Sequence, residues 1–575
     1  MLMMPNREKI IEFVRNNYVI IIILLLAFAV RWYGIYFDYP YGVESIGDES
    51  VITRYMMDVI NGKSIFAGTS SYPVLMAFFY FPVLVLRVMY LAVINGIYNV
   101  SEIEGFIIGH GIGQIFVIIR WFSVVLGTAS VYLVYRIYSL VFKYKQSAYY
   151  AALVYALSLI PVVLSHWGKM HVPMAFFLLV SLLFVLKFEI ERNEKFFFWS
   201  VIAAAASVSC HYIGVMAFTF PTLCLMYNFR DVSRRTIAKA ILIGLLIIGL
   251  GFGVNYRGIT SMVVGVYDGF LKPNNFTGLF PISPLERLYF GLVDVFRIEP
   301  IFFVLFVLMF VMNFKKYLKD RLIRYISAGL LVSYVLLVGV AGAHLSRWLL
   351  VFITFSITLA AGNFVEYLND KGLGRGIIIT GMFLLILPNA YFVGRWLSLF
   401  RDNTRAELVQ WVQDNVKEGE FIYTFDNWLG APLSYEALAL EKKLYNTSAK
   451  KQDYILAHPE VLNGVNDVNL LHAYSVQQNL GVVEGKIKYM SFLYWMSGEK
   501  ADYYEFPSKK NTYGLINQMK KNYDMKLIKT MSPVSDRKMM REGVDDYFNS
   551  PHSWRDLLYL ERGGPFIEIY EVSKK

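Results

Sequence analysis

Apolar stretches recur along the first two thirds of the chain and alternate with short polar ones. They lie near residues 18–37, 72–94, 112–142, 147–165, 172–188, 196–227, 238–256, 300–314, 325–343, 348–365 and 376–395. About twenty apolar residues suffice to cross a bilayer as a helix, and a helix satisfies its own backbone hydrogen bonds in lipid. The pattern therefore predicts a polytopic α-helical membrane protein with about 11–13 transmembrane helices.

The pattern changes after Trp396, where polar and apolar residues begin to mix. Helical spacing of apolar residues, with Gly419 beyond it, predicts a helix over Glu407–Val416. Short strand-like runs follow at Phe421–Phe425, Ala501–Phe506 and Phe566–Val572. We therefore predict two domains, a transmembrane domain over residues 1–396 and a soluble α/β or α+β domain over residues 397–575.

Composition supports the membrane assignment, because 56% of the 575 residues are hydrophobic and only 17% are charged. The net charge of +11 comes largely from short loops between apolar stretches, which is the positive-inside pattern and does not indicate nucleic-acid binding. The basic loops are Lys143/Lys145, Lys187–Lys195, Arg230–Lys239, Lys315–Arg324 and Lys371–Arg375. They predict a multi-pass protein of the cell (plasma) membrane with a cytoplasmic N-terminus and an extracytoplasmic C-terminal domain.

This orientation requires the chain to turn back within two of the apolar stretches. If all five basic loops face the cytoplasm, the chain must cross back within residues 72–111 and again within residues 196–227, around Cys210-His211. Broken or re-entrant helices would satisfy the condition, and so would a miscount of one or two spans.

The first outer loop, residues 38–71, carries the paired carboxylates Asp48 and Glu49. An acidic pair beside the bilayer is costly unless it has a function. The apolar spacing over residues 51–60 predicts an amphipathic helix on the membrane surface. Asp48 could simply cap that helix while Glu49 complements its dipole. Alternatively, Asp48 is a general base and Glu49 its partner.

Two further clusters could contact a phosphate or another part of a substrate. The first is His166, Lys169 and His171, which lie between two apolar stretches. The five-residue spacing of its histidines does not favour a metal site. The second is His344 with Arg347, where an arginine could bind phosphate through two hydrogen bonds or anchor a helix end at the interface. Tyr72, which with Pro73 opens a span, is a further candidate for substrate contact.

In order along the chain, several segments resemble a known family. They are Asp48-Glu49 in the first outer loop, Asn61-Gly62, Tyr72-Pro73, the arginine-containing stretch Leu345–Leu350, Asn403-Thr404-Arg405 followed by Trp411, and Gly564-Pro565-Phe566-Ile567. This layout resembles the GT-C glycosyltransferase superfamily, in the branch of protein O-mannosyltransferases and lipid A aminoarabinose transferases. No WWDYG-like motif is present, which argues against the oligosaccharyltransferase branch.

The resemblance implies a multispan enzyme that takes a sugar from a polyprenyl-phosphate donor on the outer face of the membrane. It implies Asp48 as the base at the acceptor, Glu49 as the adjacent acid and Arg347 near the lipid phosphate. His171 stands where family members often carry an acidic residue, which leaves the type of acceptor open.

These observations together predict transfer of a sugar from a polyprenyl-phosphate-linked donor to a hydroxyl or amine of a lipid, glycan or protein acceptor. No cofactor is required by that reaction, although the carboxylates leave room for a divalent cation. A multispan transporter or lipid flippase is the alternative, and it predicts charges near the middle of the bilayer and repeat symmetry. A membrane scaffold without catalytic activity is a third.

Overall fold

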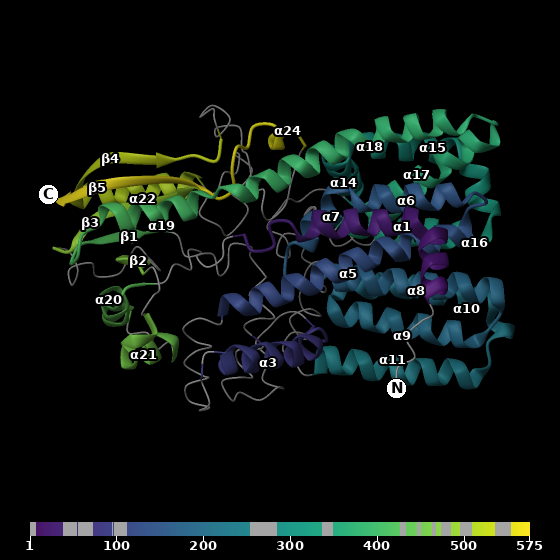
Figure 1. Ribbon diagram of the computed structural model, residues 1–575, viewed down its shortest axis with the longest axis horizontal. Helices are drawn as coiled ribbons and strands as arrows, with labels where there is room; N and C mark the ends of the chain where they lie inside the picture. The colour runs from purple at the N-terminus through teal and green to yellow at the C-terminus, as the bar shows by residue number, and fades with distance from the viewer. Residues whose placement is uncertain are drawn as a thin grey trace. The chain divides into compact units, whose positions relative to one another are not determined.

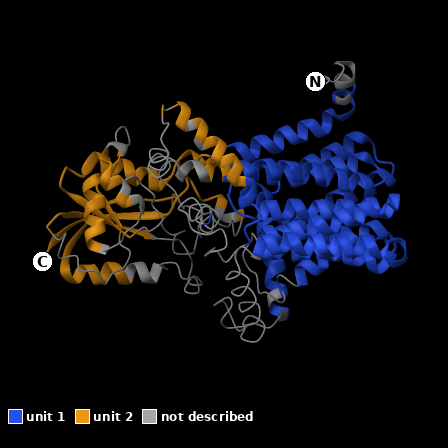
Figure 2. Cartoon of the chain, turned by 90° about the horizontal axis from the view of Figure 1, so that it is seen from below, with its two compact units in different colours: residues 1–35, 54–79, 119–394 blue, residues 36–53, 80–118, 395–575 orange. Residues whose placement is uncertain are grey.

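The computed structural model describes residues 7–37, 55, 73–94, 96, 112–253, 284–335, 338, 349–425, 433–445, 450–462, 467–472, 485–494, 509–534 and 554–575. The chain forms two compact units, coloured separately in Figure 2. Unit 1 comprises residues 1–35, 54–79 and 119–394, and unit 2 comprises residues 36–53, 80–118 and 395–575. Each unit is considered by itself below.

Helices make up the described chain as far as residue 401 (Figure 1). In order they are α1 (Arg7–Trp32), α3 (Ala77–Ile94), α5 (Ile112–Val141), α6 (Lys145–Ala156), α7 (Leu159–Ser165), α8 (His171–Glu191), α9 (Glu194–Cys210), η2 (Tyr212–Phe218), α10 (Thr219–Asn228), η3 (Phe229–Asp231), α11 (Arg234–Gly253), α14 (Pro284–Ile298), α15 (Pro300–Lys319), α16 (Arg321–Tyr334), α17 (Leu350–Asp370), α18 (Arg375–Ser398) and η6 (Leu399–Arg401).

Nine of the described helical segments are long and apolar enough to cross a membrane, or ten if the bent pair α6 and α7 counts as one span. The predicted class, a polytopic α-helical membrane protein with a C-terminal sheet-containing part, is therefore confirmed. The predicted 11–13 spans refer to the whole chain, whereas nine or ten refers to the described residues alone.

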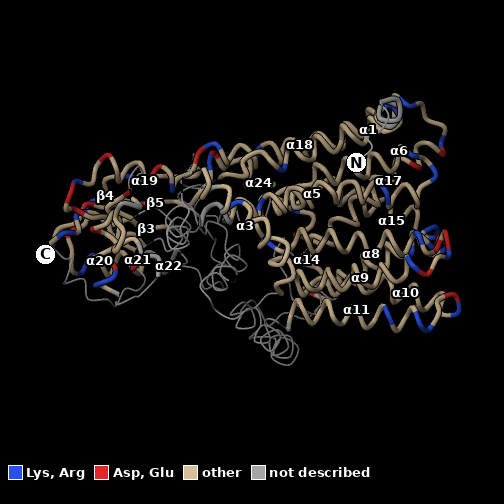
Figure 3. The backbone as a smooth tube through the Cα atoms, turned by 60° about the horizontal axis from the view of Figure 1, so that its bottom comes forward, with Lys and Arg blue, Asp and Glu red and all other residues tan. Residues whose placement is uncertain are grey.

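Lysine and arginine residues gather at one end of the unit 1 helices, here called the basic end (Figure 3). Helices α6, α9, α11 and α18 begin there, and α8 and α15 finish there. The stretch 196–227 folds back on itself as predicted, because α9 leaves the basic end and stops at Cys210. After His211, η2 and α10 return to Arg230.

Two features of unit 1 differ from the prediction. The stretch 147–165 is not one straight span, because α6 and α7 meet at a bend of 56° across Leu157 and Ser158. Between the stretches predicted at 238–256 and 300–314 lies helix α14, whose mixture of apolar and charged residues did not stand out as a span. The Ala501–Phe506 strand lies outside the described residues.

Unit 2 contains a five-stranded sheet whose order is β2-β1-β3-β5-β4. The strands are β1 (Phe421–Thr424), β2 (Leu470–His472), β3 (Ile487–Tyr494), β4 (Tyr523–Met531) and β5 (Phe566–Lys574). Strand β1 pairs in parallel with β2 and β3, whereas β5 is antiparallel to both β3 and β4. The helices of this part are α19 (Thr404–Asn415), α20 (Tyr435–Tyr445), α21 (Lys450–Ala457), η7 (Pro459–Leu462), α22 (Lys509–Asn522) and α24 (Trp554–Leu557). The predicted helix and the strands at residues 421 and 566 are confirmed.

Two segments quoted for the family resemblance lie against each other in unit 2. The Thr404 hydroxyl donates to the Pro565 carbonyl oxygen at 2.6 Å, and the Thr404 amide donates to Gly563 at 3.1 Å. Gly564 has a φ of +88°, and a Cβ there would lie 2.3 Å from the Thr404 Oγ1. Glycine is therefore required at 564 by both backbone conformation and space. The two segments form one structural joint between α19 and β5.

Candidate functional site

Three of the eight site residues predicted from the sequence lie in the described part of the chain. Asp48, Glu49, Tyr72, His344 and Arg347 lie outside it. His166, Lys169 and His171 are described, and they belong to the short link between α7 and α8, at the end of unit 1 opposite the basic end.

Helix α7 leads into the link and is separated from α6 by a break. This break leaves the last carbonyl groups of α6 without helical partners. Arg31 of α1 supplies the missing donors. Its guanidinium donates to the carbonyl oxygens of Ala156 at 3.0 Å and Tyr155 at 3.3 Å. Arg31 has no exposed surface. A cation at a helix C-terminus also complements the helix dipole.

Glu299 caps the other side of the break. Its carboxylate accepts from the Ser158 hydroxyl at 2.6 Å and from the Leu159 amide, the first of α7, at 2.8 Å. The side-chain amide of Asn389 in α18 donates to the second carboxylate oxygen. Glu299 is fully buried, and an anion at a helix N-terminus is favourable. The broken helix is thus held by a cation on one side and an anion on the other.

His166 follows α7 directly and joins it to the end of α1. Its Nδ1 lies 2.9 Å from the Val162 carbonyl oxygen, and its Nε2 lies 2.8 Å from the Tyr33 carbonyl oxygen. A neutral imidazole can donate only one of these two bonds. Arg120 of α5 donates to the Ile35 carbonyl oxygen at 3.1 Å, on the same terminal turn of the α1 segment. Arg31, Arg120 and His166 therefore gather around the end of α1.

Lys169 and His171 are buried as well, with 2% and 3% of their surfaces exposed. The Lys169 ammonium lies 4.5 Å from the centre of the Trp167 ring, at cation–π distance. The His171 ring lies 4.6 Å from the ring of His211, between α9 and η2. The sequence placed this cluster between two apolar stretches, and the structure shows that it is buried inside unit 1, where α7 contacts α1 and α8.

Sequence reasoning missed four buried polar residues around the predicted cluster, namely Arg31, Arg120, Glu299 and His211. A usable signal existed, because an ionisable residue within a long apolar run is rare and usually functional. Arg31 and Arg120 both stand in such runs. The contacts that give them partners join segments more than 80 residues apart, so spacing along the chain could not reveal them.

The described site is rich in cations, since Arg31, Arg120 and Lys169 lie at one end of the unit 1 bundle, where Glu299 is the buried carboxylate among the described residues. Such a site suits an anion, and phosphate oxygens are good acceptors for guanidinium and ammonium donors. Within the described ranges, no group of three or more His, Cys, Asp or Glu side chains could hold a metal ion.

The long apolar helices define the class of the chain as a multispan membrane protein. More particularly, residues 108–254 match the sequence model of the dolichyl-phosphate-mannose-protein mannosyltransferase family. The resemblance to the O-mannosyltransferase branch that the sequence suggests is therefore confirmed on this segment. No curated protein sequence matches the chain.

Solved structures show only weak likeness. The aminoarabinose transferase ArnT of Cupriavidus metallidurans bound to undecaprenyl phosphate has a TM-score of 0.48 and 9% identity, covering 96% of this chain and 98% of that one. The oligosaccharyltransferase AglB of Archaeoglobus fulgidus, in complex with an inhibitory peptide and a dolichol-phosphate, has a TM-score of 0.43 and 11% identity over 90% of this chain and 73% of its own. The Pmt1-Pmt2 complex of S. cerevisiae bound to the sugar donor has a TM-score of 0.31 and 16% identity over 46% and 37%. These likenesses are too weak to bear on activity.

Proposed function

We propose that this protein is a membrane glycosyltransferase. It takes a sugar from a polyprenyl-phosphate-linked donor and transfers it to a hydroxyl or amine of a lipid, glycan or protein acceptor on the outer face of the cell membrane. Asp48 is the general base. The family that matches residues 108–254 supports this donor class, since its name specifies dolichyl-phosphate-mannose.

One observation carries the proposal. The segment that matches the mannosyltransferase family, residues 108–254, contains Arg120, His166, Lys169, His171 and His211, which are all buried in unit 1. A family match and a cationic site that suits a phosphate thus coincide in the same stretch of chain.

In the proposed reaction, Asp48 accepts the proton of the acceptor O–H or N–H group while the acceptor atom bonds to the anomeric carbon. The bond from that carbon to the phosphate oxygen breaks, and the polyprenyl phosphate leaves with the electron pair. The proton stays on Asp48 until it passes to solvent. Glu49 lies next to the base in sequence and would hold the base or the acceptor in place.

The leaving phosphate gains negative charge during the reaction and needs nearby cations. Lys169 and Arg347 are proposed for this role, with His166, His171, His344 and Tyr72 as further contacts to the donor. The scheme needs no cofactor, and a divalent cation beside Asp48 and Glu49 is compatible with it.

The transporter alternative predicts charged groups inside the bundle, and Arg31 and Glu299 are such groups. Both, however, are held by backbone groups at the two sides of the helix break. A structural explanation therefore exists for each, and neither requires a transported ion.

The experiment that tests the proposal uses the full-length protein in nanodiscs with a panel of radiolabelled polyprenyl-phosphate sugars. We expect at least one donor to be consumed, with release of polyprenyl phosphate. Lys169→Gln should slow consumption of that donor more than Lys187→Gln, which changes a lysine near the C-terminal end of α8. Movement of intact donors between leaflets without consumption would instead support a flippase.

A further inference from the structure

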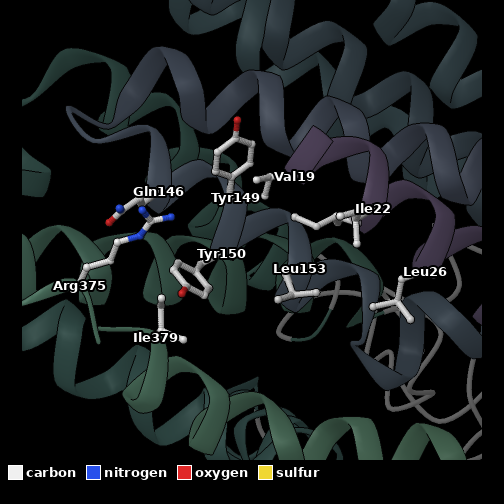
Figure 4. A pocket seen from close by; sticks show the side chains of 10 residues that line it. Val19, Ile22, Leu26, Gln146, Tyr149, Tyr150, Leu153, Arg375 and Ile379 are labelled. Carbon is white, nitrogen blue, oxygen red and sulfur yellow. The ribbon is translucent and has the colours of Figure 1, made fainter. Parts of the chain in front are cut away.

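A groove of about 310 Å³ lies on unit 1 (Figure 4). It is formed by α1, α6 and α18, and its volume falls in the range of small-ligand sites. The lining residues are Val19, Ile22, Ile23, Leu26, Gln146, Tyr149, Tyr150, Leu153, Arg375 and Ile379.

The two ends of the groove differ in chemistry. Gln146 and Arg375 mark one end, at the basic end of the helices, whereas Leu26 and Leu153 mark the other (Figure 4). Seven residues of helix separate Gln146 from Leu153, which corresponds to about 10 Å along α6. The groove is therefore amphiphilic, with a polar head and an apolar tail.

The polar head carries a positive charge without an acidic partner. Asp370, the acidic residue closest to Arg375 in sequence, accepts a hydrogen bond from Tyr144 at 3.0 Å and lies 3.9 Å from the Lys143 ammonium. Within the part of the chain that the structure describes, Arg375 forms no ion pair, and its side chain is exposed. Tyr150 lies close enough to Arg375 to interact with it electrostatically.

A polar atom at the same end also lacks a protein partner. The side-chain oxygen of Gln146 is buried and has no hydrogen bond within the described residues. The Arg375 guanidinium offers donors to an anionic group, whereas the Gln146 oxygen is an acceptor and suits a hydroxyl of the same ligand. Ile22 towards the apolar end and Ile379, one turn along α18 from Arg375, are 59% and 48% exposed, as side chains that face lipid tails would be.

We propose that this groove binds an anionic phospholipid from the leaflet at the basic end. The phosphate of the lipid contacts Arg375, a hydroxyl of its head group donates to the Gln146 oxygen, and one acyl chain lies along Ile22, Leu26 and Leu153. The charge and the apolar length together select this occupant, because a zwitterionic lipid would gain less from Arg375 and a free phosphate would leave the apolar end uncovered. The inference is independent of the proposed transferase activity.

The test uses delipidated full-length protein in detergent and native mass spectrometry with two probes, palmitoyl-oleoyl-phosphatidylglycerol and the matching phosphatidylcholine. We expect phosphatidylglycerol to bind about five- to tenfold more tightly, which is the preference expected from one or two basic contacts. Arg375→Gln should reduce the preference to near unity. Arg235→Gln, an exposed arginine at the basic end on α11, should leave the preference unchanged.

A second variant tests the apolar half. Ile22→Trp places a large ring across the groove from a largely exposed position, so it should fold normally and weaken the binding of both lipids. Equal affinity for the two lipids, a preference retained by Arg375→Gln, or full competition by glycerol phosphate alone would each overturn the proposal.

Discussion

At the scale of single residues, the buried charges of unit 1 are explained by the backbone around them. Arg31 and Glu299 cannot reach water, and each binds groups that a broken helix leaves without partners. An unsatisfied buried donor costs about 1–3 kcal/mol, so both charges stabilise the break. The break in turn positions the link that carries His166, Lys169 and His171.

Glu299→Ala should therefore destabilise the protein by at least about 2 kcal/mol, because it leaves the Ser158 hydroxyl, the Leu159 amide and the Asn389 amide without their acceptor. Thermal unfolding in detergent measures the effect. Glu191→Ala, at an exposed position, is the matched control. Equal melting temperatures for the two variants would show that Glu299 is not a cap.

Gly127 makes a second prediction at this scale. A Cβ at 127 would lie 2.3 Å from the Ser165 hydroxyl and 3.2 Å from the Arg31 Nε. Gly127→Ala should cost about 1–3 kcal/mol, and adding Ser165→Gly should recover most of the loss. Gly394→Ala, where nothing lies within 4 Å, should be neutral or stabilising. A destabilised Gly394 variant beside an unaffected Gly127 variant would contradict this account of the packing.

At the scale of elements, a buried carboxylate also ties three helices together near the basic end. Glu189 of α8 accepts from Asn228 at the end of α10 and from the Tyr325 hydroxyl of α16. Its other oxygen lies 3.1 Å from the Arg321 Nε and 3.2 Å from the Arg192 Nη2. The ends of α8, α10 and α16 are therefore joined through one side chain.

Glu189→Gln should lower stability by about 1–2 kcal/mol, because both arginines are partly exposed and their attraction is screened by solvent. Adding Arg321→Gln to Glu189→Gln should cost less than Arg321→Gln costs in the wild type. A double-mutant cycle measured by thermal unfolding checks this coupling. Fully additive losses would mean that the helices are held elsewhere.

The sequence predicted elements better than it predicted their breaks. Long apolar runs such as residues 112–142 and 376–395 correspond to single helices, because lipid leaves the backbone no alternative. The bend at Leu157-Ser158 follows from Pro161, which has no amide hydrogen to donate to the Leu157 carbonyl oxygen in a continuous helix. It is compensated by Arg31 and Glu299, which lie more than 120 residues away in opposite directions. Helix α14 was missed because its charged residues interrupt the apolar run.

The candidate site was only partly predictable for the same reason. The histidines and the lysine between two spans correctly pointed to residues 166–171 as a candidate cluster. Their burial, however, depends on how the link packs, which the sequence does not show. His211 drew attention only as part of a turn, whereas its ring faces His171. The roles of Asp48, Glu49, Tyr72, His344 and Arg347 remain predictions from the sequence and the family resemblance.

At the scale of the whole molecule, the basic end predicts how the protein is oriented in the membrane, with that end facing the cytoplasm. We expect Lys371→Cys and Asn193→Cys, at that end, to be protected from a membrane-impermeant maleimide in intact cells, whereas Lys417→Cys in unit 2 should react. Cys210 and Cys224 are both buried, so the native background should be low. Labelling of Lys371→Cys from outside would reverse the proposed topology.

The central claim is that Asp48 acts as the base of a lipid-donor glycosyltransferase. The most direct measurement compares donor consumption by the wild type and by Asp48→Asn, with donor binding and thermal stability measured on the same samples. We expect the variant to bind donor and to fold, but to transfer sugar at least about a hundredfold more slowly. A folded Asp48→Asn variant that transfers sugar at the wild-type rate would contradict the claim.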